Sequence, residues 1–182
     1  MGLFTSSYLR NKYSESLITE QKRYFSSVDK SKLKFDIFLS HSYLDKEEVL
    51  GLYRELTDMG FSVYVDWIID ADLDRTNVTK ETAELIKSRM KNSQSLLLAI
   101  STNASMSKWM PWELGFVDGK TDRCVIVPIS KDNNLSFNRV EYLKLYPYLD
   151  ITNGNLWVND DINSYISFRR WMNGDNPIRR NP

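Results

Sequence analysis

Between residues 34 and 130, short apolar runs alternate with segments whose apolar positions recur at helical spacing. The runs at 35–39, 61–65, 96–100 and 124–129 are rich in aliphatic, aromatic and β-branched residues, and they predict four strands. The run at 96–100 is apolar at every position, which is typical of a strand that helices cover on both faces.

The segment after the first predicted strand has the signals of a helix start and a helix end. Asp45 precedes Glu48 by three residues, which is the spacing of a capping box. Apolar residues then follow at helical spacing as far as Gly60, which fits a C-terminal cap.

Two more helices are expected between the later strands. Thr79 predicts the start of one, and the other is expected over 108–118, ending at Gly119. Alternating strands and helices with short connections favour right-handed crossovers and therefore a doubly wound parallel sheet. In such sheets the ligand lies beyond the carboxyl ends of the strands.

A long polar loop is expected from Trp67 to about residue 78. Asp70, Asp72 and Asp74 alternate along it, but the glycine and the terminal glutamate of a calcium-binding loop are missing. We therefore interpret these aspartates as a solvated turn.

Residues 1–33 predict an N-terminal extension that is partly helical. Leu9, Tyr13 and Leu17 recur four apart, which indicates a modest amphipathic helix. A partly ordered leader is an equally good interpretation.

The sequence after residue 130 gives weaker signals of secondary structure. Trp157 and Val158 are expected in an edge strand, and Asp160 or Asp161 is expected to cap a last helix. That helix would carry Ile162, Ile166 and Met172.

Charge and composition exclude several classes of function. Among 182 residues, 24 Lys and Arg balance 24 Asp and Glu, so neither a nucleic-acid nor a membrane partner is expected. One cysteine and one histidine exclude a Cys/His metal cluster, and no metal site or resident cofactor is expected. No apolar stretch has the length of a signal core or a membrane span, so we expect a cytoplasmic protein.

The strongest candidate for chemistry is the pair Trp109 and Glu113, four residues apart at the start of a predicted helix. An aromatic plane beside a carboxylate suits a flat cationic ring attached to a sugar. The carboxylate would stabilise positive charge on the sugar carbon, while a pyridinium leaving group departs neutral without a general acid. The alternative is a core tryptophan and a solvated glutamate.

Three segments together resemble the conserved boxes of the Toll/interleukin-1 receptor (TIR) domain family. These are residues 35–42, residues 60–66 and residues 107–114, which include the Trp-x-x-x-Glu pattern. The resemblance covers about 34–130, and we expect the TIR domain to span 34–175. It implies a flavodoxin-like fold, and the sequence Trp-Glu-Leu-Gly at residues 112–115 is most similar to the bacterial branch.

In enzymatic members, the family cleaves the nicotinamide–ribose bond of NAD, which would be the substrate and not a cofactor. The resemblance implies that Glu113 is the catalytic carboxylate and that Trp109 stacks on the ring. It also implies nucleotide contacts at four further residues: Ser40, His41, Asp66 and Trp67. From the residues alone, we favour a hydrogen-bonding role for His41 over that of a general base.

Two further implications concern products and partners. The products would be nicotinamide with ADP-ribose or a cyclic or rearranged relative, in bacterial antiphage defence. Self-association through the TIR domain and a separately encoded effector that reads the product are the expected partners. The loop after Asp66 lacks the Gly-rich segment of many enzymatic members. The alternatives are a non-catalytic TIR–TIR interaction module and a deoxyribosyltransferase-like enzyme.

Overall fold

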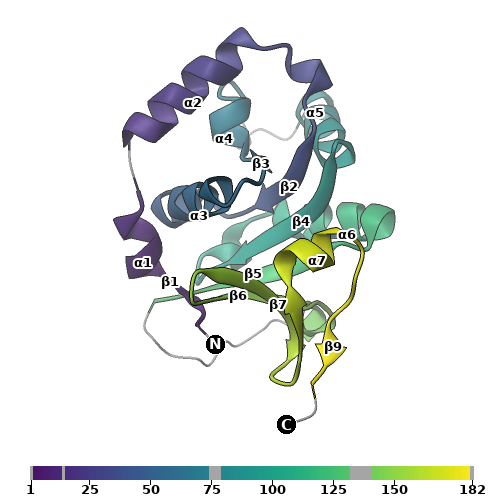
Figure 1. Ribbon diagram of the computed structural model, residues 1–182. Coiled ribbons are helices and arrows are strands. Elements are labelled where there is room, and N and C mark those ends of the chain that lie inside the picture. The colour runs from purple at the N-terminus through teal and green to yellow at the C-terminus, as the bar shows by residue number, and fades with distance from the viewer. Residues whose placement is uncertain (1, 14, 74–78, 132–140, 181–182) are drawn as a thin grey trace.

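The computed structural model describes residues 2–13, 15–73, 79–131 and 141–180. Its centre is a mixed sheet in which five strands run parallel in the order β3-β2-β4-β5-β6 (Figure 1). In chain order these strands are β2 (Phe35–Ser40), β3 (Val63–Tyr64), β4 (Ser93–Ile100), β5 (Cys124–Ser130) and β6 (Tyr148–Thr152). Numbered from β2, this order is 2-1-3-4-5, which confirms the predicted flavodoxin-like, doubly wound sheet.

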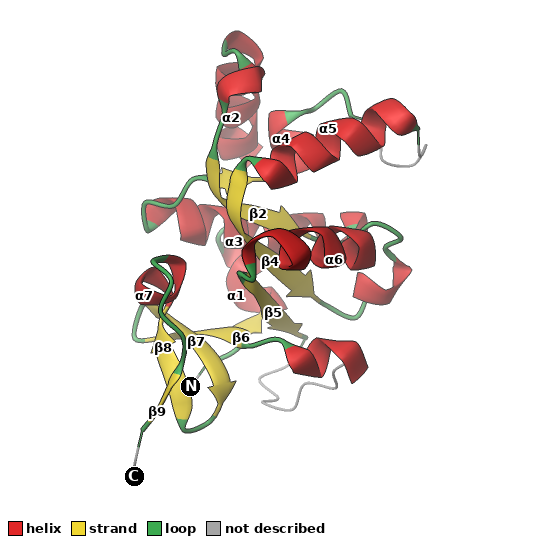
Figure 2. Cartoon of the chain, turned by 90° about the vertical axis from the view of Figure 1, so that its right-hand side faces the viewer, coloured by secondary structure: helices red, strands yellow, loops and turns green. Residues whose placement is uncertain are grey.

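Helices cover both faces of this parallel sheet (Figures 1 and 2). Helix α3 (Lys46–Asp58) lies on one face, and α5 (Lys80–Lys91) and α6 (Met110–Thr121) lie on the other. Seven of the eight residues of β4 are buried, as its continuous apolar run predicts.

The predicted helix ends are partly confirmed. The Thr79 hydroxyl accepts a hydrogen bond from the Thr82 amide at 3.1 Å, and Gly60 has a φ of 89° just after α3. Asp45 is the N-cap residue of α3, as predicted, but the capping box does not form, because the Asp45 side chain makes no capping bond and turns toward the end of β4. The prediction for Gly119 is also wrong: α6 continues to Thr121 and ends at Asp122, which is left-handed with a φ of 54°.

The N-terminal extension contains β1 (Phe4–Thr5), α1 (Ser6–Asn11), α2 (Glu15–Ser27) and the 3-10 turn η1 (Lys30–Lys32). The single helix predicted from the spacing of Leu9, Tyr13 and Leu17 is therefore two helices. Strand β1 pairs in parallel with the end of β5, at Phe4 and Ile129. Helix α1 packs so closely on α3 that a Cβ at Gly51 would collide with the Leu9 backbone. The extension is thus continuous with the sheet and its helices.

The segment after β3 is not the polar loop that we expected. Residues Asp66–Ile69 form the short helix α4, and Ile68 and Ile69 are each 1% exposed. Helix α4 packs against α2 of the extension. Burial of these two isoleucines explains why the segment folds back onto the domain. Residues 74–78, including Asp74, lie outside the described residues.

The C-terminal part continues the sheet in antiparallel fashion through β7 (Asn155–Asp161), β8 (Ser164–Ser167) and β9 (Ile178–Arg179), with α7 (Phe168–Met172) between the last two. The prediction of a helix beginning at Asp160 or Asp161 is wrong. Val158 and Ile166 pair across β7 and β8 and are both buried, while Ile162 is 70% exposed between the two strands. Trp157 lies in a strand, as predicted, but β7 has neighbours on both sides and is no edge.

Candidate active site

Glu113 and Ser40 form a buried hydrogen bond at the carboxyl edge of the parallel sheet. The Ser40 hydroxyl donates to Glu113 Oε2 at 2.6 Å, and both residues are 0% exposed. Ser40 is the last residue of β2, and Glu113 lies in the first turn of α6, which follows β4. Two segments 73 residues apart therefore place a carboxylate and a hydroxyl where ligands of such sheets bind.

The local sequence explains why Glu113 faces inward. Pro111 lies in the first turn of α6, where a proline loses no helical hydrogen bond. Trp109 is the N-cap residue, and its carbonyl accepts the Glu113 amide at 2.9 Å. The helix dipole favours a negative charge in this first turn.

Trp109 lies in an aromatic cluster at the start of α6. Its ring meets that of Trp112 edge-on, with centroids 5.6 Å apart, and Trp112 in turn lies 6.2 Å from Phe116. Trp109 is half-buried and Trp112 is 37% exposed. The Trp109 indole lies one helical turn before the buried Glu113 and is open on part of its surface, so it can stack on a flat ring.

His41, Asp66 and Trp67 form a second group beside Ser40. The Trp67 indole donates to His41 Nε2 at 3.0 Å, and His41 Nδ1 lies 2.9 Å from the Leu39 carbonyl oxygen. Because Nε2 accepts, the geometry assigns the proton to Nδ1, which donates to that carbonyl. Asp66 Oδ1 lies 3.5 Å from His41 Nε2. These contacts hold the His41 ring in place, and we call His41, Asp66 and Trp67 together the His41 wall.

The structure therefore brings the six predicted site residues to one edge of the sheet. Five of them form the two groups just described, and these groups adjoin because Ser40 and His41 are consecutive in the chain. The Lys46 ammonium lies 5.2 Å from the centre of the Trp67 ring and adds a positive charge at this edge. The roles of these residues remain predictions.

The sequence did not predict two polar clusters, of which only the first lies near this edge. The Asp45 carboxylate accepts hydrogen bonds from Ser101 and from Asn103, whose amide nitrogen is 2.7 Å away. This ties the turn η2 (Tyr43–Asp45) to η3 (Ala104–Met106), the turn that precedes Trp109. The other cluster joins Asp70 to Arg89. Asp70 is 6% exposed, so its interpretation as part of a solvated turn is wrong.

A pocket of about 540 Å³ opens at the seam between the extension and α3. Arg10 of α1 and Glu48 of α3 line it and form a hydrogen bond of 2.8 Å. The Glu113 carboxylate is not part of its lining.

The described residues hold neither a candidate metal-binding cluster nor a membrane-spanning helix. They contain no group of three or more His, Cys, Asp or Glu side chains that would hold a metal ion. None of the helices in the described ranges has the length and apolar character needed to cross a membrane. Cys124 is buried at the opposite, amino end of β5, and this burial raises the pKa of its thiol to about 12.

The doubly wound sheet with Glu113 and Trp109 after its third parallel strand is that of a TIR domain. The chain belongs to the TIR domain family, whose model matches residues 37–166. It is 44% identical, over 81% of its length and 80% of the relative's, to the probable 3′ cyclic ADP-D-ribose synthase ThsB′ of Bacillus cereus (strain MSX-D12).

Two more distant similarities are to another bacterial protein and to an animal receptor domain. The chain is 31% identical to the putative cyclic ADP-D-ribose synthase TIR2 of Cytobacillus dafuensis, over 57% of this chain and 28% of that protein. The crystal structure of the TIR domain of the Toll-related receptor TRR-2 from Hydra magnipapillata aligns with a TM-score of 0.44 and 20% identity. That alignment covers 60% of this chain and 77% of the receptor domain.

Proposed function

We propose that this chain is a TIR enzyme that cleaves the nicotinamide–ribose bond of NAD and releases a cyclic ADP-ribose. The observation that carries the proposal is the fully buried Glu113 carboxylate, held by Ser40 at the carboxyl edge of the sheet. The name of the Bacillus cereus relative, which covers most of this chain, supports the cyclic product over simple hydrolysis.

The proposed cleavage requires one carboxylate and one aromatic ring from the protein. As the bond breaks, its electron pair leaves with nicotinamide, which departs neutral, and positive charge grows on the ribose carbon. The Glu113 carboxylate stabilises that charge, and Trp109 stacks on the departing ring. A hydroxyl of the other ribose then attacks the carbon and loses its proton to Glu113, which gives the cyclic product. Attack by water instead gives linear ADP-ribose.

The residues around His41 would hold the rest of the substrate. Asp66 and Trp67 form a wall with His41, and Lys46 supplies a positive charge for a negatively charged pyrophosphate. We propose that self-association completes the site. We further propose that the protein works in the bacterial cytoplasm in antiphage defence, where a separately encoded effector reads the product.

The test is incubation of the purified protein with NAD while nicotinamide release is followed by chromatography. Glu113→Gln keeps the shape of the side chain but removes its charge, and we expect release to fall by about 10²- to 10³-fold. The matched control is Glu55→Gln, since Glu55 is also a buried glutamate but lies on α3 and bonds Tyr8. Release that persists in Glu113→Gln would contradict the proposal.

Two further measurements separate the alternatives. Mass spectrometry distinguishes the cyclic product from ADP-ribose, which contains one more water, and the 3′-linked isomer is the first standard to compare. Absence of nicotinamide release from both dilute and artificially clustered protein would favour the non-catalytic interaction module.

A further inference from the structure

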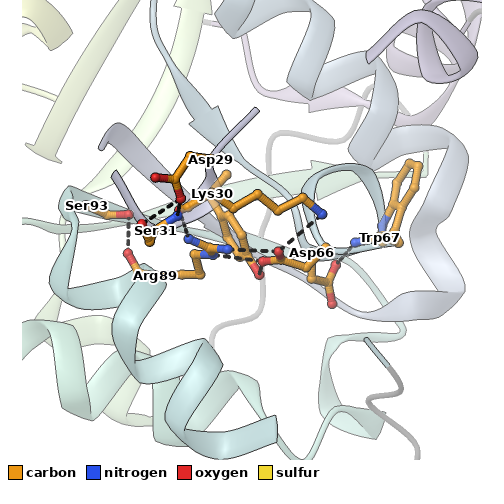
Figure 3. A network of polar contacts seen from close by, with 9 residues as sticks. Asp29, Lys30, Ser31, Asp66, Trp67, Arg89 and Ser93 are labelled. Atoms are coloured by element: carbon orange, nitrogen blue, oxygen red, sulfur yellow. Dashed lines mark hydrogen bonds and ion pairs between the residues drawn. The ribbon is translucent and has the colours of Figure 1, made fainter. Parts of the chain in front are cut away.

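A buried ion pair lies where the N-terminal extension, α4 and α5 meet (Figure 3). Its members are Asp70, at the end of α4, and Arg89, in the last turn of α5, with side chains 7% and 4% exposed. Arg89 Nε lies 2.8 Å from Asp70 Oδ2, and Arg89 Nη2 lies 2.9 Å from Oδ1. This is the bidentate arrangement that a planar guanidinium makes with a carboxylate.

The same guanidinium also holds the extension. Its remaining nitrogen, Nη1, donates to the backbone carbonyl of Lys30 in η1 at 2.5 Å. Figure 3 shows Arg89 beside Lys30 and Ser31 of the extension, with Asp66 and Trp67 further to the right. One side chain therefore joins the extension to the segment that carries two of the predicted substrate contacts.

Tyr64 adds a third donor to Asp70. Its hydroxyl donates to Asp70 Oδ2 at 3.0 Å from the end of β3. Burial, together with the nearby Asp70 and Asp66 carboxylates, raises the pKa of the Tyr64 hydroxyl well above its ordinary value, so it keeps its proton. Asp70 is thereby fixed from the sheet and from α5 at once.

Helix α4 has only four residues, and a helix this short does not hold its own shape in water. Its two ends are directly coupled, because the Asp70 amide donates to the Asp66 carbonyl at 2.7 Å. At the far end, Asp66 and Trp67 meet His41. The place of the His41 wall therefore depends on how Asp70 is anchored.

We propose that Asp70 and Arg89 are positioning residues that set the wall formed by Asp66 and Trp67 against the substrate. This inference rests on the proposed function, because the substrate is taken to be NAD. The pair holds α4 in place against His41. The Lys30 carbonyl accepts from Arg89 and thereby ties the N-terminal extension to the same ion pair. Loss of the pair should loosen substrate binding and let water compete with the internal ribose hydroxyl.

The main test uses the double variant Asp70→Leu with Arg89→Met. Apolar side chains of similar size replace a buried ion pair with little loss of stability, so the variant should fold. We expect the KM for NAD to rise by about 10-fold or more, since small displacements in a site have effects of this size. The ratio of cyclic to linear product should fall, while Glu113 still supports nicotinamide release.

The single variant Arg89→Lys keeps the charge but loses the fork that reaches Asp70 and Lys30 together. We expect it to shift KM and product ratio in the same direction as the double variant. The matched control is Arg10→Met with Glu48→Leu. That pair also joins the extension to the domain, with the glutamate side chain 7% and the arginine 57% exposed, and its bonds run between α1 and α3, not to α4. The control should leave KM and product ratio unchanged.

A second measurement does not depend on catalysis. The indole N–H resonance of Trp67, assigned by its loss in Trp67→Phe, reports the bond to His41 in nuclear magnetic resonance spectra. It should shift in the Asp70/Arg89 variant and stay in place in the Arg10/Glu48 control. Unchanged KM, product ratio and resonance in a folded Asp70/Arg89 variant would overturn the inference, as would equal changes in the control. If the wild type releases no nicotinamide, the proposed function fails, and the resonance still decides whether the pair anchors α4.

Discussion

The parallel and antiparallel parts of the sheet differ in what they can gather. Parallel strands β2 to β5 all end at one edge, so Ser40 and the segment after β4 that leads to Glu113 meet there. Strand β6 is parallel to β5 and antiparallel to β7, so from β6 through β9 successive strands end at opposite edges. We call β6 to β9 with α7 the antiparallel part. Every predicted site residue lies in the parallel part or in its connections. Substitutions at the carboxyl edge of the parallel part should therefore affect activity, and those in the antiparallel part should affect stability alone.

The largest effect is expected in the antiparallel part. Trp171 of α7 is 2% exposed and stacks on Phe168, with ring centroids 5.7 Å apart. Trp171→Ala should lower the free energy of unfolding by about 3–5 kcal/mol, because it removes a large buried side chain and leaves a cavity. Denaturant titration measures the loss, and the half-buried Trp157→Ala is the milder control. Nicotinamide release per folded molecule should stay at the wild-type level. A fall in this release would contradict the expectation that the antiparallel part affects stability alone.

The next effect is expected at the parallel edge. Ser40→Ala removes the hydroxyl that donates to Glu113, and a hydrogen bond to a charged group contributes about 1.5–3 kcal/mol. Nicotinamide release should fall by about 10- to 100-fold. Ser95→Ala is the matched control, because Ser95 is an equally buried serine in the neighbouring strand β4 whose hydroxyl donates to the Asp36 carbonyl. Equal losses of activity in the two variants would contradict a specific role for Ser40.

A smaller effect of opposite sign is expected at Asp150 of β6. This residue is 1% exposed, and its carboxylate oxygens have no hydrogen-bond partner within the described part of the chain. Burial raises the pKa of the Asp150 carboxyl, so the folded state keeps the proton to a higher pH than the unfolded chain does. Wild-type stability should therefore decrease as the pH rises from the ordinary carboxyl pKa through this raised value.

The variant that removes this titration is Asp150→Asn. It should raise the free energy of unfolding at about pH 7 by on the order of 1 kcal/mol, because the amide carries no charge for burial to penalise. The gain should shrink toward about pH 3, below the ordinary carboxyl pKa of about 3.9, where the wild-type carboxyl is mostly protonated in both states. Unfolding curves at the two pH values measure this difference, and a gain independent of pH would show that ionisation is not its cause.

The smallest expected effect tests the amino edge of the parallel part. With a thiol pKa of about 12, only about one Cys124 thiol in 10,000 is ionised at pH 8. Iodoacetamide should therefore leave both Cys124 and nicotinamide release untouched in the folded protein and react once the chain is unfolded. Rapid alkylation of the folded protein would show that this edge opens.

The sequence predicts the parallel part of the sheet better than the antiparallel part. Buried strands between helices are long apolar runs, so the sequence predicts the presence and approximate bounds of β4 and β5. The hairpin of β7 and β8 contains exposed polar residues such as Asp160 and Asp161, and a helical spacing of Ile162 and Ile166 was mistaken for a helix. Pairing with a neighbouring strand decided the structure there, and no local pattern reports that pairing.

The candidate site was predictable where it depends on residue type and on the order of elements. Trp109 and Glu113 stand out because an aromatic residue and a carboxylate flank a helix start after a buried strand. Asp70 was not predictable, since alternate aspartates in a polar segment are usually solvated. Its burial follows from Arg89, 19 residues further along the chain, and from the extension that covers both.

The sequence by itself determined the parallel sheet, the family and the carboxylate at its edge, because these follow from apolar runs and short motifs that act locally. Only the tertiary structure decided the bond between Ser40 and Glu113, the wall of His41 with Trp67, and the anchoring of α4 by Asp70 and Arg89. Each of these joins side chains that are distant in the chain. Their partners are fixed when burial removes water and leaves each polar group to bond what folding has placed beside it.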